Sequence, residues 1–253
     1  MTSPTRSPLA GRTALVTGGS RGIGRAVVER LAADGASVVF SYATDRAAAD
    51  AVLAAVEAAD GRAWAEQADF TDRDAPRRLY DAAEERLEGL DVLVNNAGSS
   101  VRPVPIDETT DEDYDRLMRV NTWSVFALMR EAYTRLRDDG RIVNVSTLNT
   151  VAPTAAVAVH AASKAAVEQF AACAARDLGA RGVTVNTVLP GATDTDLLRT
   201  NNPGVDLEAA LAPLTPLRRL GRPDDVAAVV AFLCGPDGRW ITGQSLRATG
   251  GLP

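Results

Sequence analysis

The sequence predicts one α/β domain in which a doubly wound parallel sheet carries helices on both faces. Short β-branched runs alternate with longer Ala-rich stretches, a glycine-rich turn joins the first such pair, and no Pro- or Gly-rich linker divides the chain. With 253 residues, 46% of them hydrophobic, the chain is long enough for one large core and rather short for two. We therefore expect a single domain over residues 11–253, preceded by a flexible polar tail over residues 1–10.

The expected elements follow one another in βα order. The first two strands are short β-branched runs, and the first two helices are longer stretches rich in Ala. The first half of the chain gives strand 13–17, helix 22–34, strand 37–41, helix 46–59, strand 62–66, helix 73–87 and strand 91–94. The second half gives a long helix 111–136, strand 141–145, helix 159–178 and strand 183–188. Alternation of this kind is typical of a parallel sheet that is covered on both faces.

Residues 191–217 interrupt this alternation with polar residues and prolines. Loops longer than about 12–15 residues are uncommon inside compact domains and are usually functional. We therefore expect a substrate loop or lid over 191–217.

Composition excludes several classes of function. The formal net charge of −6 argues against nucleic-acid and membrane-surface partners, and no apolar stretch approaches the roughly 20 residues of a membrane span. The N-terminus lacks the apolar core of a secretory signal, so we expect a cytoplasmic protein. Cys173 and Cys234 are far apart and His160 is the only histidine, so we expect no metal site.

The turn Thr17-Gly-Gly-Ser-Arg-Gly-Ile-Gly24 lies between the first expected strand and the first expected helix. Glycines there permit a tight turn and a close approach of the backbone to a phosphate. The N-terminus of the following helix directs free N–H groups and the positive end of its dipole at an anion. This context predicts a dinucleotide site of the Rossmann type.

Further motifs come in a fixed order along the chain. They are Asp69, Asn95-Asn96-Ala97-Gly98, Asn121, Ser163-Lys164, Pro190-Gly191 with Thr195, and Gly250-Gly251. Together with the TGxxxGxG pattern they make nearly the whole chain resemble the short-chain dehydrogenase/reductase family.

The resemblance implies a cofactor site spread over the whole domain. The diphosphate would lie on the glycine turn, the adenine beside Asp69 and Phe70, and the nicotinamide carboxamide on residues 190–195, while Lys164 would hold a ribose. The implied contacts are Gly18, Ser20, Arg21, Gly22, Ile23, Gly24, Tyr42, Asp69, Phe70, Asn96, Ala97, Gly98, Lys164, Pro190, Gly191, Thr193 and Thr195. The family also implies a homo-oligomer, most often a tetramer, that pairs through helices 111–136 and 159–178.

The cofactor is expected to be NADP(H). In the family, an acidic residue at the end of the second strand binds the ribose 2′-hydroxyl of NAD, whereas this sequence has Ser41-Tyr42-Ala43 there. No carboxylate would repel a 2′-phosphate at that point, and Arg21 in the glycine turn could pair with it. Asp45 lies close by in sequence and acts against this preference.

The catalytic set departs from the family pattern. The family uses Tyr-x-x-x-Lys on a helix and a serine thirteen residues before the tyrosine, and the corresponding residues here are His160, Lys164 and Thr147. Ser146 is adjacent to Thr147, and Asn121 matches the family's asparagine. None of the four tyrosines lies near this helix, so a small shift of register does not restore the pattern.

The histidine has two opposing consequences. An imidazole has an ordinary pKa of ~6.5, against ~10 for a phenol, which suits proton transfer near neutrality. The neighbouring Lys164 ammonium and an oxidised nicotinamide would both disfavour imidazolium and so weaken proton donation. Three interpretations stay open: a redox enzyme in which His160 replaces the tyrosine, a redox-neutral enzyme that retains NADP, and a cofactor-binding scaffold.

The substrate is expected to be a small molecule bound over the nicotinamide and beneath the lid. The side chains expected to meet it mix apolar and amide groups: Leu197, Leu198, Asn201, Asn202 and the run 207–214.

Overall fold

The computed structural model describes residues 7–252. The greater part of the expected tail, residues 1–6, lies outside the described residues. Leu9 is buried, at 1% exposure, and its backbone N–H donates to the carbonyl of Asp34 at 2.8 Å. The chain is therefore packed onto the domain from that residue.

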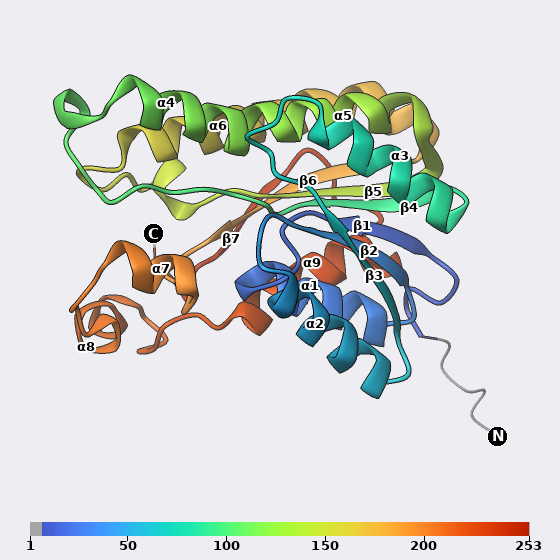
Figure 1. Ribbon diagram of the computed structural model, residues 1–253, viewed down its shortest axis with the longest axis horizontal. Coiled ribbons are helices and arrows are strands. Elements are labelled where there is room, and N and C mark those ends of the chain that lie inside the picture. The colour runs from blue at the N-terminus through green and yellow to red at the C-terminus, as the bar shows by residue number, and fades with distance from the viewer. Residues whose placement is uncertain (1–6, 253) are drawn as a thin grey trace.

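A seven-stranded sheet, parallel throughout, forms the centre of the molecule (Figure 1). Its strand order is β3-β2-β1-β4-β5-β6-β7. The strands are β1 (Thr13–Val16), β2 (Ser37–Tyr42), β3 (Arg62–Gln67), β4 (Leu90–Asn95), β5 (Leu136–Val145), β6 (Thr184–Pro190) and β7 (Ser245–Ala248). The predicted doubly wound parallel sheet is confirmed.

Helices cover both faces of this sheet. In Figure 1 one layer contains α3 (Ala75–Leu87), α4 (Asp111–Leu117), α5 (Ser124–Arg135) and α6 (Ala158–Leu178). The other contains α1 (Gly22–Ala33), α2 (Arg46–Ala58) and α9 (Pro223–Cys234). Each layer has its own buried apolar cluster: Phe40 and Val230 lie in the cluster under α1 and α9, and Leu93 and Val167 in the one under α3 and α6.

The predicted long helix 111–136 is not continuous. α4 ends at Leu117, a π-helical turn η2 (Met118–Trp123) follows, and α5 continues to Arg135. The N–H of Ser124 reaches back five residues to the carbonyl of Arg119, which is the bonding pattern of a π turn. The turn contains Asn121, which is fully buried.

The sequence patterns did not predict α9 or β7. They also did not predict that the lid is partly helical. α9 and the edge strand β7 follow the lid, and Pro223 at the start of α9 and Asp225, which accepts from the Arg222 N–H, are ordinary helix-start signals. The expected loop 191–217 contains two short α-helices, α7 (Asp196–Asn201) and α8 (Leu207–Leu211), followed by a 3₁₀ turn η5 (Ala212–Leu214).

The strand order reverses at β1, which pairs with β2 on one side and β4 on the other. In open α/β sheets, ligands bind outside the carboxyl ends of the strands at such a switch point. The glycine turn follows β1 and Asn96–Gly98 follows β4, so both motifs lie there. Within residues 7–252, no helix is long and apolar enough to cross a membrane, and no three potential ligand side chains cluster to hold a metal.

Candidate active site

The glycine turn is built so closely that a side chain would not fit. A Cβ at Gly24 would lie 2.1 Å from the carbonyl oxygen of Gly18 and 2.4 Å from Nδ2 of Asn96. Gly18 has a backbone φ of +64°, a left-handed value that residues with a Cβ rarely adopt. α1 begins at Gly22 with no side-chain cap and no acidic residue in its first turn, so its N-terminus is open to an anion.

The turn and the loop after β4 form one hydrogen-bonded unit. Thr17 Oγ1 accepts from the backbone N–H groups of Asn96 at 3.0 Å and Ala97 at 2.9 Å. Asn96 Nδ2 donates back to the carbonyls of Thr17 at 2.9 Å and Gly18 at 3.1 Å. Two other residues of this turn that were expected to contact the cofactor are less accessible to a ligand: Ser20 is buried, and Ile23 packs against the core.

At the end of β2, only part of the expected contact surface faces solvent. Ser41 Oγ accepts from the Gly18 N–H at 3.0 Å, and the Tyr42 ring is buried in the core, so Ala43 is the first exposed residue. Arg21 lies 3.5 Å from Asp45, both side chains being about half exposed, and the other Asp45 oxygen caps α2.

Sequence reasoning missed Arg46, a second cation near this point. Its guanidinium lies 6.0 Å from the centre of the Tyr42 ring and pairs with Asp50 at 2.8 Å. Its place in the first turn of α2 was the available signal.

The residues expected beside the adenine divide between core and surface. Phe70 is buried in the cluster under α3, whereas Asp69 is exposed and accepts from the N–H of Thr71 at 2.9 Å.

The segment after β6 returns to the glycine turn. Gly191 donates to the carbonyl of Ala248, and Thr193 Oγ1 donates to the carbonyl of Gly191 at 3.0 Å. Thr195 caps α7, and its Cγ2 lies 3.3 Å from the place that a Cβ on Gly22 would occupy. Predicted cofactor residues from the two ends of the chain therefore meet.

Lys164 is the only lysine in the sequence, and it is 4% exposed. Its Nζ donates to the carbonyl of Val145 at 2.9 Å and lies 3.2 Å from the place of a Cβ on Gly98. Burial lowers the pKa of Lys164 to about 8, because an ammonium loses hydration in the interior. An ammonium has three N–H donors, so two remain for other acceptors.

Asn121 is a clamp between the loop after β4 and α6. Its Nδ2 donates to the carbonyl of Ser99 at 2.9 Å and to Oγ of Ser163 at 3.0 Å, and its Oδ1 accepts from the Ser99 N–H at 2.7 Å. These three bonds use both N–H donors and the oxygen of the amide. The side chain is thus committed to the protein itself.

His160 lies four residues before Lys164 on α6, and its imidazole is held in the neutral form. Burial, together with the Lys164 charge, lowers the pKa of His160 to about 4, and a hydrogen-bonding contact with the Ser99 backbone acts in the other direction. Nδ1 of the ring is buried and has no hydrogen-bond partner among residues 7–252. One ring nitrogen is thus left without a hydrogen bond to the described part of the protein.

The hydroxyls after β5 differ in availability. Ser146 is buried and donates to Oε1 of Glu168 at 2.7 Å, so its hydroxyl is already used. Thr147 is half-buried, and its Oγ1 accepts a long bond, 3.3 Å, from the Asn149 N–H. No hydrogen bond joins Thr147 to His160 in the described part of the chain, whereas Asn121, Ser163 and His160 are connected.

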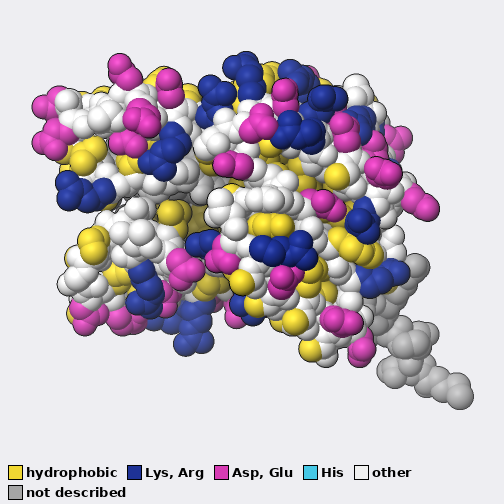
Figure 2. All heavy atoms as spheres, viewed as in Figure 1, with side chains coloured by type: hydrophobic (Ala, Val, Ile, Leu, Met, Phe, Trp, Pro, Cys, Tyr) yellow, Lys and Arg dark blue, Asp and Glu magenta, His cyan; other side chains and the backbone are white. Residues whose placement is uncertain are grey.

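The lid stands apart from these catalytic candidates. The space-filling view shows a recess between the part that carries α4 and the part that carries α7 and α8 (Figure 2). Leu197 is 45% exposed, Leu198 is half-buried, and Asn202 Nδ2 donates to the carbonyl of Leu198. The backbone N–H of Leu217 donates to the carbonyl of Gly250 at 3.1 Å, which ties the end of the lid to the C-terminal segment.

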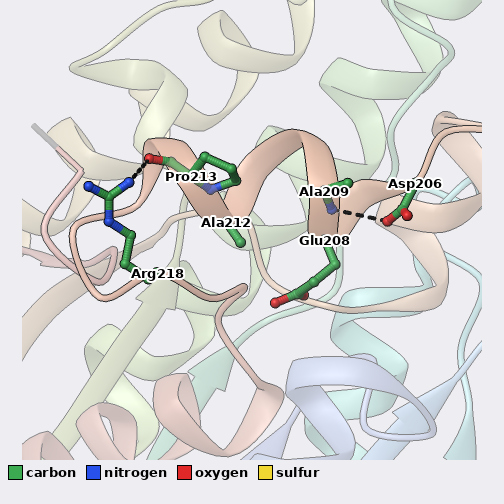
Figure 3. A pocket seen from close by; sticks show the side chains of 6 residues that line it. All are labelled: Asp206, Glu208, Ala209, Ala212, Pro213 and Arg218. Atoms are coloured by element: carbon green, nitrogen blue, oxygen red, sulfur yellow. Dashed lines mark hydrogen bonds between the residues drawn. The ribbon is translucent and has the colours of Figure 1, made fainter.

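A hollow of about 480 Å³ lies on the lid itself (Figure 3). It is lined by Asp206, Glu208, Ala209, Ala212, Pro213 and Arg218. Asp206 caps α8, and Arg218 donates to the carbonyl of Pro213 at 2.7 Å, so two of the three charged groups already have partners. None of the predicted catalytic or cofactor residues lines it.

Comparison with known proteins supports the resemblance over the whole chain. A family model described as enoyl-(acyl carrier protein) reductase matches residues 18–253. A hydroxynaphthalene reductase-like protein, Arp2, of Metarhizium guizhouense is 39% identical over 265 residues, covering 99% of each chain.

Solved structures agree with this result. The short chain dehydrogenase from Burkholderia cenocepacia in complex with NADP is 44% identical, with a TM-score of 0.90 over 97% of this chain and 99% of that one. The angucycline C-6 ketoreductase LanV with bound NADP is 39% identical, with a TM-score of 0.91 over 97% of each chain.

Proposed function

The chain belongs to the short-chain dehydrogenase/reductase family of oxidoreductases, and from this premise we propose that it transfers a hydride between NADP(H) and a small-molecule carbonyl, alcohol or imine. The observation that carries the proposal is the arrangement around Lys164. The only lysine and the only histidine of the chain lie one helical turn apart, beside the loop after β4 and next to Asn121. The glycine turn lies at the same edge of the sheet.

The residues at the switch point suit a dinucleotide. A space closed to any Cβ at Gly24 and an uncapped N-terminus of α1 suit a diphosphate that touches backbone N–H groups. Lys164 has two N–H donors to offer to a ribose. Thr195 lies beside the glycine turn and Thr193 lies in the same segment after β6; both are proposed to hold the carboxamide. The nicotinamide supplies the hydride in reduction and accepts it in oxidation.

The phosphorylated cofactor is favoured by charge. No carboxylate stands at residues 41–43, and Arg21 is half exposed at the adjoining turn, where it could bind a 2′-phosphate. Asp45 competes for the same guanidinium at 3.5 Å, and an exposed pair at that distance contributes little, about 0–1 kcal/mol. The two similar structures with bound NADP support the same choice.

His160 is proposed to move the substrate proton. With a pKa of about 4, its imidazole is neutral at pH 7 and accepts a proton from an alcohol, whose hydride is then released more easily. In reduction the same ring donates as imidazolium, a minor form at that pH. The Lys164 ammonium lies one turn away and stabilises an alkoxide while opposing imidazolium. Thr147 is proposed to orient the carbonyl oxygen with its hydroxyl.

A redox-neutral reaction is the second candidate, and the Nδ1 of His160, which has no hydrogen-bond partner among residues 7–252, is the observation that favours it. A neutral imidazole with a free ring nitrogen can accept a proton, and removal of a proton next to a carbonyl needs a base and an oxyanion partner but no hydride. The scaffold interpretation would leave His160 without a role, and it is tested by the same assays.

We also propose that the protein is a homo-oligomer, with a tetramer as the first expectation. Trp123 at the end of η2, Phe126 on α5 and Phe170 on α6 form an aromatic strip, with ring centres 5.5 and 5.8 Å apart; Phe126 is 38% exposed and the other two are half-buried. An aromatic side chain that is exposed in this way suits a contact surface.

The decisive experiment follows NADPH absorbance with a panel of ketones, quinones, imines and alcohols. Hydride transfer should depend on His160 and Lys164: His160→Ala should reduce turnover by ~10² to 10⁴-fold with little change in NADPH affinity, and Lys164→Ala should impair both. Product formation without any net change in NADPH would support the redox-neutral candidate. Activity that survives His160→Ala intact would contradict a catalytic role for this residue.

A further inference from the structure

Ser163 lies three residues after His160 and one before Lys164 on α6, and its side chain is fully buried. We propose that this serine is a positioning residue: its hydroxyl joins Asn121 to the turn of α6 that carries His160 and so fixes the surroundings of the imidazole. The inference rests on the proposed function, in which His160 moves the substrate proton.

The first argument is that Ser163 bonds in two directions. Its Oγ donates to the carbonyl of His160 at 2.8 Å, which is the ordinary habit of a serine inside a helix. The same oxygen also accepts from Asn121 Nδ2 at 3.0 Å, and Asn121 belongs to a different element, 42 residues away. The second bond is the one that helix structure alone does not require.

The second argument is that these contacts close a ring around His160. Asn121 fixes Ser99 through both backbone groups, at 2.9 and 2.7 Å, and the Ser99 backbone contacts the imidazole. Ser163 therefore acts on His160 from two sides. It holds the backbone carbonyl of the residue directly, and it holds the surroundings of the ring through Asn121 and Ser99.

Removal of the Ser163 hydroxyl would open this ring. Asn121 is fully buried, so its second N–H would be left without a partner, and a buried unpaired donor is unfavourable enough to drive rearrangement. A freed Asn121 no longer fixes Ser99, and more water then reaches the half-buried imidazole. Loss of the Ser99 contact by itself lowers the pKa of His160, whereas hydration of the ring relieves the burial that keeps it neutral; burial is the larger of these two effects, so the net shift is upward.

The chain offers a matched control in the neighbouring residue of η2. Thr122 Oγ1 donates to the backbone carbonyl of Ser163 at 2.8 Å, and it thus joins the same two elements; among residues 7–252 its hydroxyl makes no hydrogen bond to Asn121, Ser99 or the imidazole. Thr122→Val removes this bond with little change of shape. The Thr122→Val variant therefore shows the effect of looser packing of η2 against α6 alone.

The experiment uses the only histidine of the sequence as its probe. Histidine-selective isotope labelling gives ring signals from His160 alone, and these are titrated by NMR in the full chain of the wild type, Ser163→Ala, Ser163→Thr and Thr122→Val. The midpoint for Ser163→Ala should move upward by at least about one unit toward the ordinary value of ~6.5. Ser163→Thr keeps the hydroxyl and should titrate as the wild type does, and so should Thr122→Val.

Kinetics give the second readout. The pH profile of kcat for carbonyl reduction should shift in the same direction in Ser163→Ala, while KM changes by less than about threefold, because the serine does not touch the substrate. If Ser163→Ala does not fold, Ser163→Cys keeps the shape with a weaker hydrogen-bonding group and should shift the midpoint in the same direction.

An unchanged His160 midpoint in the folded Ser163 variants would overturn the proposal, and so would an equal shift in Thr122→Val. The titration requires no turnover. A wild type without hydride transfer would therefore contradict the proposed function while the positioning role is still decided by NMR.

Discussion

Carbonyl reduction by this protein should accelerate steeply as the pH falls below 7, because the proposed proton donor is an imidazole that is held neutral. With the His160 pKa at about 4, roughly one molecule in a thousand carries imidazolium at pH 7, against about one in four for a free histidine. Each unit of pH decrease between 7 and 5 should then raise kcat for reduction about tenfold.

Alcohol oxidation should behave differently, since it needs the neutral ring. Its rate should be flat between pH 5 and 7 and fall only near pH 4, where the imidazole becomes protonated. Between pH 7 and 5, acid would thus accelerate reduction and leave oxidation unchanged.

The assay measures initial rates of NADPH oxidation and NADP reduction over this range, corrected for enzyme-free decay of NADPH in acid. His160→Tyr is the matched variant, because a phenol with a pKa near ~10 stays protonated throughout and should give a flat reduction profile. A flat profile in the wild type, or a steep one that persists in His160→Ala, would show that the proton comes from another source.

Four further outcomes are expected. NADP(H) should bind more tightly than NAD(H) by calorimetry, and Arg21→Ala should reduce this preference while Ala43→Asp, at an exposed site, moves it toward NAD(H); equal affinities in the wild type would contradict the assignment. Gly24→Ala should abolish NADPH binding and lower Tm by several degrees, whereas Gly179→Ala, where a Cβ meets nothing within 4 Å, should do neither. Because the folded pKa of His160 lies below its unfolded value of 6.5, its contribution to stability should be lost as the pH falls from about 6.5 to about 4, and denaturant unfolding should show a weaker loss in His160→Gln. Light scattering should find an oligomer at micromolar concentration, and Phe126→Asp should dissociate it; a monomeric wild type would remove the argument from the aromatic strip.

Sequence patterns predicted the sheet well because every strand before the lid except β3 contains a distinct β-branched or apolar run. β7 escaped prediction because Ser245–Ala248 alternates exposed and half-buried residues around Arg247 and has no apolar run. α9 carried readable start signals at Pro223 and Asp225, and the expected elements ended before it. The π turn carries no local signal, since the helical pattern continues through it.

For the candidate site, the resemblance to the family was more informative than the spacing of the residues alone. It identified Asn121 and Lys164, and the structure brings both next to the turn of His160. Tyr42 and Phe70 were expected at the cofactor, but their side chains lie in the two apolar clusters of the core, Tyr42 in the cluster under α1 and α9 and Phe70 in the cluster under α3 and α6. Ser163 was not singled out for a role of its own, because a serine in a helix has an ordinary explanation and its partner is distant in sequence.

The π turn at Met118–Trp123 also limits which insertions and deletions this part of the chain tolerates. A π turn holds one more residue than an α turn, so deletion of one residue that restored α-helical bonding here would remove the wide turn itself. The position of Asn121 within that turn would be lost, and with it the approach of its side chain to Ser99. An insertion or deletion between Leu117 and Ser124 should therefore disturb the Asn121 contacts even where no side chain is changed.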